Sequence, residues 1–122
     1  MTEYLIFFND EWVPDLTDED LRKASKAVSA LRAEMEAAGV LIFTGGLDDA
    51  APVLSVDASS GTPLITDGPY TETKEHIGGF AVVDVADEEA ARLWAGKIAV
   101  ACGWPQEVRR FQYATQAEEQ SS

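Results

Sequence analysis

Tyr4-Leu5-Ile6-Phe7-Phe8 is an unbroken run of apolar and aromatic residues near the start of the chain. A strand with one solvent-facing side alternates apolar and polar residues, whereas a continuous apolar run is typical of a strand covered on both faces. Phe80-Ala81-Val82-Val83-Asp84-Val85 has the same character at nearly every position. The two runs predict strands of one sheet, and each face of that sheet must be covered.

Two amphipathic helices are predicted between and after these strands. Thr17 begins a capping box, apolar residues recur at steps of three and four from residue 21 to residue 38, and Gly39 stands where a helix ends. Asp87 is the expected N-cap of the second helix, and Gly103 is its terminator. The same pattern places the apolar stripe of each helix against the sheet.

Shorter apolar segments predict further strands at residues 40–43, 53–56, 62–66 and 107–113, and the second and third of these are expected to form a hairpin. The order is then strand, helix, several strands, helix, strand, which indicates an α+β fold. A ferredoxin-like sandwich, with two helices on one face of an antiparallel sheet, fits this order best. We expect residues 1–114 to form a single domain and the polar tail, residues 115–122, to fray.

Two helices can cover only one face of such a sheet. The opposite face would then expose a large apolar surface, which is rare on soluble monomers. A second copy of the chain is the simplest cover for it, and the sequence therefore predicts a homodimer packed sheet to sheet.

The chain is strongly acidic, with 22 Asp and Glu against 9 Lys and Arg among 122 residues. This charge disfavours nucleic acid and anionic membrane surfaces as partners. No apolar run approaches the ~20 residues of a membrane helix, and no signal peptide is recognisable at the N-terminus, so we expect a cytoplasmic protein. One Cys and one His cannot build a zinc site, and we expect no metal and no cofactor.

Turn-forming and ionisable residues are concentrated in the connection at residues 66–79, which has the sequence TDGPYTETKEHIGG. Connections this long in a compact domain are more often functional loops than spacers. Glu72, Lys74, Glu75 and His76 place four ionisable side chains within five positions.

Residues 64–80 resemble the YCII-related superfamily, in particular its branch named for an Asp-Gly-Pro-Phe (DGPF) motif. The matching positions are Asp67-Gly68-Pro69-Tyr70, the following Glu-Thr-Lys-Glu, and Gly78-Gly79-Phe80, with Tyr70 at the Phe position. The resemblance implies a ferredoxin-like fold that dimerises into an α/β barrel, a cleft near the motif, and association with extracytoplasmic-function sigma factors. Better-understood relatives imply a catalytic His and Asp pair with the His in the first helix, but this first helix contains no His.

Asp67 and His76 are the candidate catalytic residues for acid-base chemistry, since a carboxylate and an imidazole can exchange protons with a substrate. Asp67 could instead cap the Asp-Gly-Pro turn, and His76 could be an ordinary loop histidine. Tyr70, Glu72, Lys74 and Glu75 are candidate ligand-binding residues. The three charged ones could equally form ion pairs within the loop, each worth only ~0–1 kcal/mol.

Two functions remain open from the sequence. The first is a small-molecule-binding protein that could act as a cofactor-independent acid-base enzyme near the loop. The second is a non-catalytic sensory or interaction module that serves a sigma factor. Arg109 and Arg110 could counter an anionic ligand or merely compensate nearby acids.

Several residues have structural interpretations. The Gly45-Gly46 and Gly78-Gly79 pairs match no phosphate-binding fingerprint, and we interpret them as turn and close-packing glycines. Cys102 is predicted to be a small buried apolar residue, because no neighbouring cation marks it as an activated thiol. Trp94 lies on the apolar stripe of the second helix and is predicted to be in the core.

Overall fold

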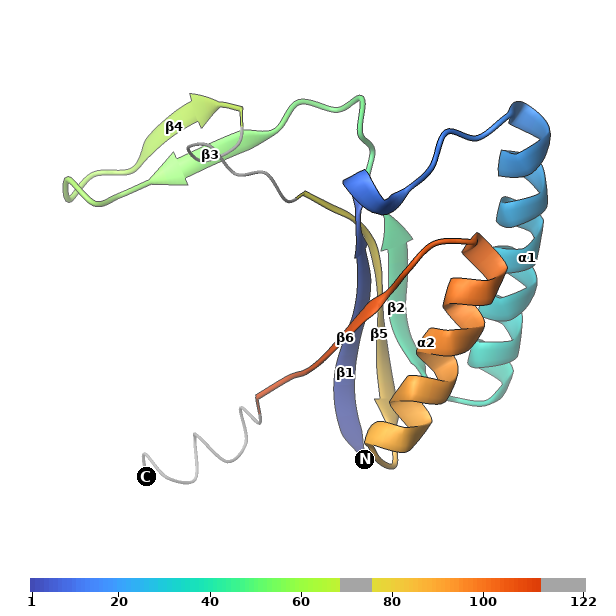
Figure 1. Cartoon of the computed structure of the whole chain (residues 1–122). Coiled ribbons are helices and arrows are strands. Elements are labelled where there is room, and N and C mark those ends of the chain that lie inside the picture. The colour runs from blue at the N-terminus through green and yellow to red at the C-terminus, as the bar shows by residue number, and fades with distance from the viewer. Residues whose placement is uncertain (69–75, 113–122) are drawn as a thin grey trace, which may run out of the picture.

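Two α-helices lie on one face of a four-stranded antiparallel sheet, and a separate two-stranded hairpin extends from the opposite side (Figure 1). The computed structural model of the chain describes residues 1–68 and 76–112. The main sheet and its helices are formed, in chain order, by β1 (Thr2–Asn9), α1 (Asp18–Ala37), β2 (Leu41–Gly46), β5 (Ile77–Val85), α2 (Glu88–Cys102) and β6 (Glu107–Arg110). A 3-10 turn (Asp10–Trp12) follows β1, and the hairpin consists of β3 (Leu54–Asp57) and β4 (Leu64–Asp67).

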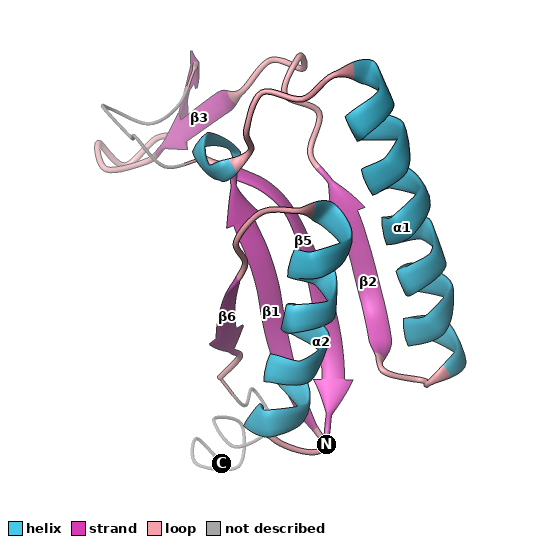
Figure 2. Ribbon diagram, turned by 45° about the vertical axis from the view of Figure 1, so that its right-hand side comes forward, coloured by secondary structure: helices cyan, strands magenta, loops and turns pink. Residues whose placement is uncertain are grey.

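The strands of the main sheet lie in the order β2-β5-β1-β6. Every neighbouring pair is antiparallel, and Ile6 pairs with Ala81 while Leu5 pairs with Val82. The two strands with continuous apolar sequence, β1 and β5, are therefore the two central strands. The prediction of an α+β fold with two helices on an antiparallel sheet is confirmed (Figure 2).

Both helices begin and end where the sequence predicts. The Thr17 side chain accepts a hydrogen bond from the Asp20 amide at 3.1 Å, and the Asp20 carboxylate accepts one from the Thr17 amide at 3.2 Å. The Asp87 carboxylate accepts a hydrogen bond from the Ala90 amide at 2.9 Å. Gly103 ends α2 with a φ of 97°, a left-handed conformation that glycine adopts without a steric penalty.

The core lies between the sheet and the helices. Ile6 of β1 and Val83 and Val85 of β5 are almost completely buried there, together with Met35 of α1 and Ala91 of α2. Successive strand residues point to opposite faces, so the even positions of β1 and the odd positions of β5 face the helices. This alternation leaves the other residues of both strands to the opposite face of the sheet.

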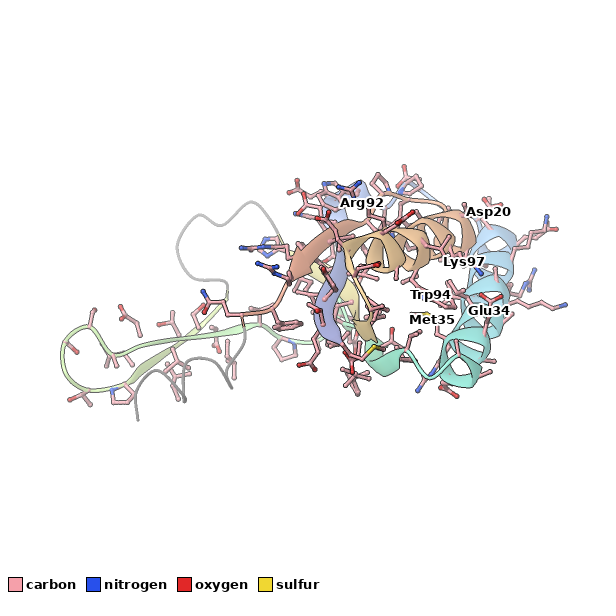
Figure 3. The ribbon with its side chains drawn as sticks, turned by 90° about the horizontal axis from the view of Figure 1, so that it is seen from below. Asp20, Glu34, Met35, Arg92, Trp94 and Lys97 are labelled. Carbon is pink, nitrogen blue, oxygen red and sulfur yellow. The ribbon has the colours of Figure 1, made fainter. Side chains whose placement is uncertain are left out.

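The two helices are also joined directly. Figure 3 shows Glu34 of α1 and Lys97 of α2 facing each other, and the Lys97 ammonium lies 3.0 Å from the Glu34 carboxylate. The same ammonium lies 4.8 Å from the ring centroid of Trp94. Trp94 is only half-buried and packs at the margin of the core, where its ring supports this pair.

The face of the sheet turned away from the helices is also apolar. We call it the open face, and its apolar side chains are Leu5, Phe7, Phe43, Phe80 and Val82. The rings of Phe43 and Phe80 lie 5.8 Å apart between centroids, and Phe43 is 59% exposed. The prediction that β1 and β5 are apolar on both faces is thus confirmed.

Two strand predictions need correction. The strand predicted at residues 62–66 is Leu64–Asp67, so Asp67 ends a strand instead of opening a loop. The strand predicted at 107–113 ends at Arg110 within the part of the chain that the structure describes. The hairpin predicted from the strands at 53–56 and 62–66 is confirmed, and it stands apart from the main sheet, because β3 pairs with β4 alone.

Candidate functional site

A cavity of about 300 Å³ lies between α1, the end of α2 and the sheet. We call it the α1 cavity. Leu21, Ala24, Val28 and Leu31 of α1 form one wall. Apolar residues of the sheet and of α2 form most of the remainder, with Phe8 and Trp104 at one end.

The apolar stripe of α1 explains why this cavity exists. The sequence predicts one apolar stripe along the helix, and of its residues Met35 is buried, while Leu21 is 49% and Val28 is 41% exposed. Leu31 and Met35 pack on the core and also line the cavity, whereas the N-terminal residues Leu21, Ala24 and Val28 line the cavity without packing on the core cluster. Spacing identifies the apolar face of a helix but not the distance to the surface opposite it, so the sequence pattern did not separate Leu21 and Val28 from Met35.

The floor of the cavity is the end of β2, where three small residues follow one another. The Thr44 hydroxyl donates a hydrogen bond to the Phe80 carbonyl at 2.9 Å, which fixes its side chain close to the sheet. A Cβ atom on Gly45 would contact the Phe43 ring at 3.7 Å, on the open face. A Cβ atom on Gly46 would meet nothing within 4 Å. Gly46 therefore leaves space at the cavity that a larger side chain could fill.

The aromatic end of the cavity depends on the second glycine pair. A Cβ atom on Gly79 would come within 2.8 Å of Phe8 Cε1, and one on Gly78 within 2.6 Å of Phe8 Cε2. The Phe8 ring can lie against the backbone of β5 only because both positions lack side chains. Trp104 then meets Phe8 edge to face, with ring centroids 5.4 Å apart. The interpretation of Gly78 and Gly79 as close-packing glycines is confirmed.

Cys102 contributes the one thiol of the chain to the cavity wall. It is 8% exposed, which confirms the prediction of a buried residue. The Gln106 side-chain amide donates a hydrogen bond to Cys102 Sγ at 3.3 Å, and the thiol donates weakly to the Trp104 carbonyl at 3.6 Å. These contacts hold the thiol at the end of α2, beside the aromatic end of the cavity.

Polar groups lie on the α1 side of the cavity. Ser25 and Arg32 both line it and are exposed. The Arg32 Nε atom donates to a Glu36 carboxylate oxygen at 3.0 Å, in a pair that is more than half exposed on both sides. The guanidinium is held in place by this pair but retains further donors for a ligand.

The candidate catalytic residues lie elsewhere. Asp67 is exposed at the end of β4, and His76 is half-buried immediately before β5, where its carbonyl accepts a hydrogen bond from the Asp10 amide at 2.8 Å. Neither residue lines the α1 cavity. The candidate ligand-binding residues Tyr70, Glu72, Lys74 and Glu75 fall outside the described residues, as does the tail at 115–122.

Within residues 1–68 and 76–112, no three His, Cys, Asp or Glu side chains lie close enough together to hold a metal ion. Neither of the two described helices combines the length and the apolarity that a membrane span requires.

A family model described as the YCII-related domain matches residues 3–104, from β1 to the end of α2 and the aromatic end of the cavity. The chain belongs to the YCII-related family. A protein of Rhizobium meliloti (strain 1021), itself called uncharacterized, is 28% identical over 88 residues, which are 71% of each chain. The matched part of this YCII-related chain contains every residue that lines the α1 cavity except Gln106.

Sequence reasoning missed the α1 cavity as a site. Phe8, Gly46 and Trp104 carry no reactive group, so a search for titratable residues passes over them. The sequence does contain one indication of the cavity. Gly45 and Gly46 follow the strand predicted at 40–43, and the preceding helix carries a long apolar stripe. Glycines in a strand often mark a place where another group approaches the backbone closely.

Proposed function

We propose that this YCII-related protein binds a small, mainly apolar molecule in the α1 cavity. The observation that carries the proposal is the unpacked N-terminal half of the α1 stripe, where Leu21 and Val28 line empty space. Protein interiors are close-packed, so an apolar helix face without a packing partner is a natural binding surface. A volume of about 300 Å³ is at the lower end of ligand pockets and suits a molecule with one or two rings.

The walls define the chemistry of the ligand further. The Phe8 and Trp104 rings favour an aromatic or flat aliphatic body, since such rings stack or meet edge to face. Arg32 and Ser25 on the α1 side favour a ligand with one polar or anionic group at its outer end. We therefore expect indole and benzoate to be suitable probes, the first neutral and the second anionic.

A thermal-shift experiment tests the proposal. A ligand that binds only the native state raises the melting temperature in proportion to the logarithm of its concentration. We expect indole or benzoate at millimolar concentration to raise the melting temperature of the protein, and glycerol at the same concentration to have no effect. If neither ring compound shifts the melting temperature up to its solubility limit, the proposal is wrong.

We propose acid-base chemistry at Asp67 and His76 separately from ligand binding in the α1 cavity, and each can be tested without the other. Neither residue lines the cavity, so Asp67→Asn and His76→Ala should leave the affinity for indole unchanged. A reaction that uses these residues would instead be slowed by both substitutions while ligand affinity is retained. An activity that survives both substitutions at full rate would remove them from the catalytic proposal.

We further propose that the chain acts as a homodimer in which a second copy covers the open face and completes a dimeric α/β barrel. The support is the aromatic surface of Phe43 and Phe80 beside Leu5, Phe7 and Val82, on the side without helices. Light scattering at micromolar concentration should give twice the mass of the chain. A monomeric mass at all concentrations would exclude this arrangement.

A further inference from the structure

A second cavity, of about 290 Å³, lies at the end of the main sheet where the 3-10 turn follows β1. We call it the β1 cavity. It is lined by Phe7, Phe8, Asn9, Trp12, Ile77 and Glu107. Phe8 is the one described residue that lines both this cavity and the α1 cavity. The β1 cavity therefore has no part in the ligand binding proposed above.

Asn9 brings a buried carboxamide to the β1 cavity, since this residue is only 6% exposed. Its Oδ1 atom accepts a hydrogen bond from the Glu11 amide at 2.9 Å. An N–H group can be met only by an acceptor, so this bond also fixes which way the carboxamide is turned. The Nδ2 atom, which carries two donors, forms no hydrogen bond within residues 1–68 and 76–112.

The Asn9 nitrogen remains accessible from the cavity. Buried polar side chains almost always have hydrogen-bond partners, because an unpaired donor loses its bond to water without compensation. In the described part of the chain, the one side-chain nitrogen or oxygen that is both sealed off and without a partner is Trp104 Nε1. The Asn9 nitrogen is therefore in contact with free space, and the β1 cavity is the space that Asn9 lines. Its two donors are available to a group bound there.

Backbone hydrogen bonds hold the residues of this cavity in place. The Asp10 amide donates to the His76 carbonyl at 2.8 Å, which joins the 3-10 turn to the start of β5. The Val13 amide donates to the Asp10 carbonyl at 3.2 Å and closes the turn that carries Trp12. A site that is held in this way loses little conformational entropy when it binds a ligand.

Glu107 brings an acceptor to the same cavity. It pairs with Phe7 at the start of β6, and Asn9 lies two residues further along β1. Diagonal neighbours on two antiparallel strands are about 7–8 Å apart, which leaves room for a ligand group between their side chains. Glu107 is exposed and takes part in none of the ion pairs formed among the described residues. The cavity thus combines a free donor with a free acceptor.

We propose that the β1 cavity binds a small planar molecule that carries a neutral hydrogen-bond acceptor beside an N–H donor, as a cyclic amide does. The acceptor binds Asn9 Nδ2, the donor binds the Glu107 carboxylate, and Trp12 contributes an aromatic wall. An anionic ligand is disfavoured, because Glu107 lines the cavity and the chain has a net charge of -13. A volume of about 290 Å³ suits a single ring.

An NMR titration of the full chain with 2-pyridone, a one-ring cyclic amide, tests the proposal. Asn9 is the only asparagine in the sequence, so protein labelled with nitrogen-15 in asparagine gives a single side-chain amide pair. We expect 2-pyridone to move this pair downfield in a saturable way. In uniformly labelled protein the backbone amides of Trp12 and Ile77 should shift as well, whereas those of Ala24 and Gly46 in the α1 cavity should not.

The role of Glu107 is tested with N-methyl-2-pyridone, which keeps the acceptor and lacks the donor. It should bind about tenfold more weakly than 2-pyridone, because one hydrogen bond to a carboxylate is lost. Glu107→Ala should remove most of this difference. Glu3→Ala is the matched control, since Glu3 is an exposed carboxylate of β1 that does not line the cavity, and it should preserve the difference.

Three results would overturn the inference. The first is an Asn9 side-chain pair that does not shift up to the solubility limit of 2-pyridone, a result that leaves the ligand proposed for the α1 cavity unaffected. The second is an unchanged difference between the two pyridones in Glu107→Ala, since the size of the methyl group would then explain it. The third is a set of shifts confined to Ala24, Gly46 and Cys102, which would place 2-pyridone in the α1 cavity and support the proposed function instead.

Discussion

Replacement of Gly46 with leucine should reduce ligand binding in the α1 cavity and at the same time stabilise the fold. A Cβ atom at this position meets nothing within 4 Å, and Gly46 does not have a positive φ that would strain another residue. The first carbon of a leucine side chain is therefore free of clashes, and the pairing of Gly46 with Gly79 directs the side chain to the helix side of the sheet, where the cavity lies. Few substitutions that damage a binding site are expected to raise stability, so the combination is diagnostic.

The size of the effect follows from burial and backbone entropy. Full burial of a leucine side chain contributes about 1.5–3 kcal/mol, and glycine in a strand costs about 0.5–1 kcal/mol relative to alanine. The leucine side chain loses about 0.5–1 kcal/mol of rotamer entropy, and Gly46 is itself exposed at the cavity, so burial is partial. We expect the free energy of unfolding to rise by about 1–2 kcal/mol, or several degrees in melting temperature.

The assay is isothermal titration with indole, combined with thermal unfolding of each variant. Gly96→Leu on α2 is the matched control, because a Cβ atom there also meets nothing within 4 Å and Gly96 does not line the cavity. Gly46→Leu should weaken indole binding at least tenfold, and Gly96→Leu should leave it unchanged. Unchanged indole affinity in a stable Gly46→Leu protein would refute the assignment of the cavity as the binding site.

Three further predictions concern the parts that shape the cavity. Gly79→Ala should lower the free energy of unfolding by about 1–3 kcal/mol in urea denaturation, because its Cβ atom would overlap the Phe8 ring, whereas Gly46→Ala should cause no loss. Alkylation of Cys102 by iodoacetamide, followed by mass spectrometry, should slow in the presence of indole, and an unchanged rate would count against Cys102 as part of the occupied wall. Thr17→Ala should cost about 1 kcal/mol of stability without changing ligand affinity, because it removes the N-cap of α1, and a Thr17→Ser control should retain most of that stability.

Local signals were sufficient for most of the secondary structure. The caps at Thr17 and Asp87 and the stop at Gly103 depend on neighbours within a few residues, so the sequence itself carries them. The apolar runs of β1 and β5 also predicted correctly that both faces of the sheet are apolar, since side-chain direction in a strand follows from sequence position.

The packing of these elements against one another could not be predicted from neighbouring residues. Nothing local distinguishes Leu21, which is 49% exposed, from Met35, which is buried, because both lie on one helical stripe. The departure of β3 and β4 from the main sheet depends on pairing between strands, which strand propensity does not determine. The search for titratable groups led to Asp67 and His76, whereas the α1 cavity is lined mainly by apolar side chains.

A two-dimensional amide NMR titration of the protein with indole is the most direct test of ligand binding in the α1 cavity. Saturable shifts should be largest for the amides of Ala24, Gly46 and Cys102, which line the cavity on α1, β2 and α2. The amides of Leu54 and Val56 on β3 should remain unchanged. Shifts confined to the β3–β4 hairpin or to the open face, with Ala24, Gly46 and Cys102 unaffected at saturation, would contradict the proposed function.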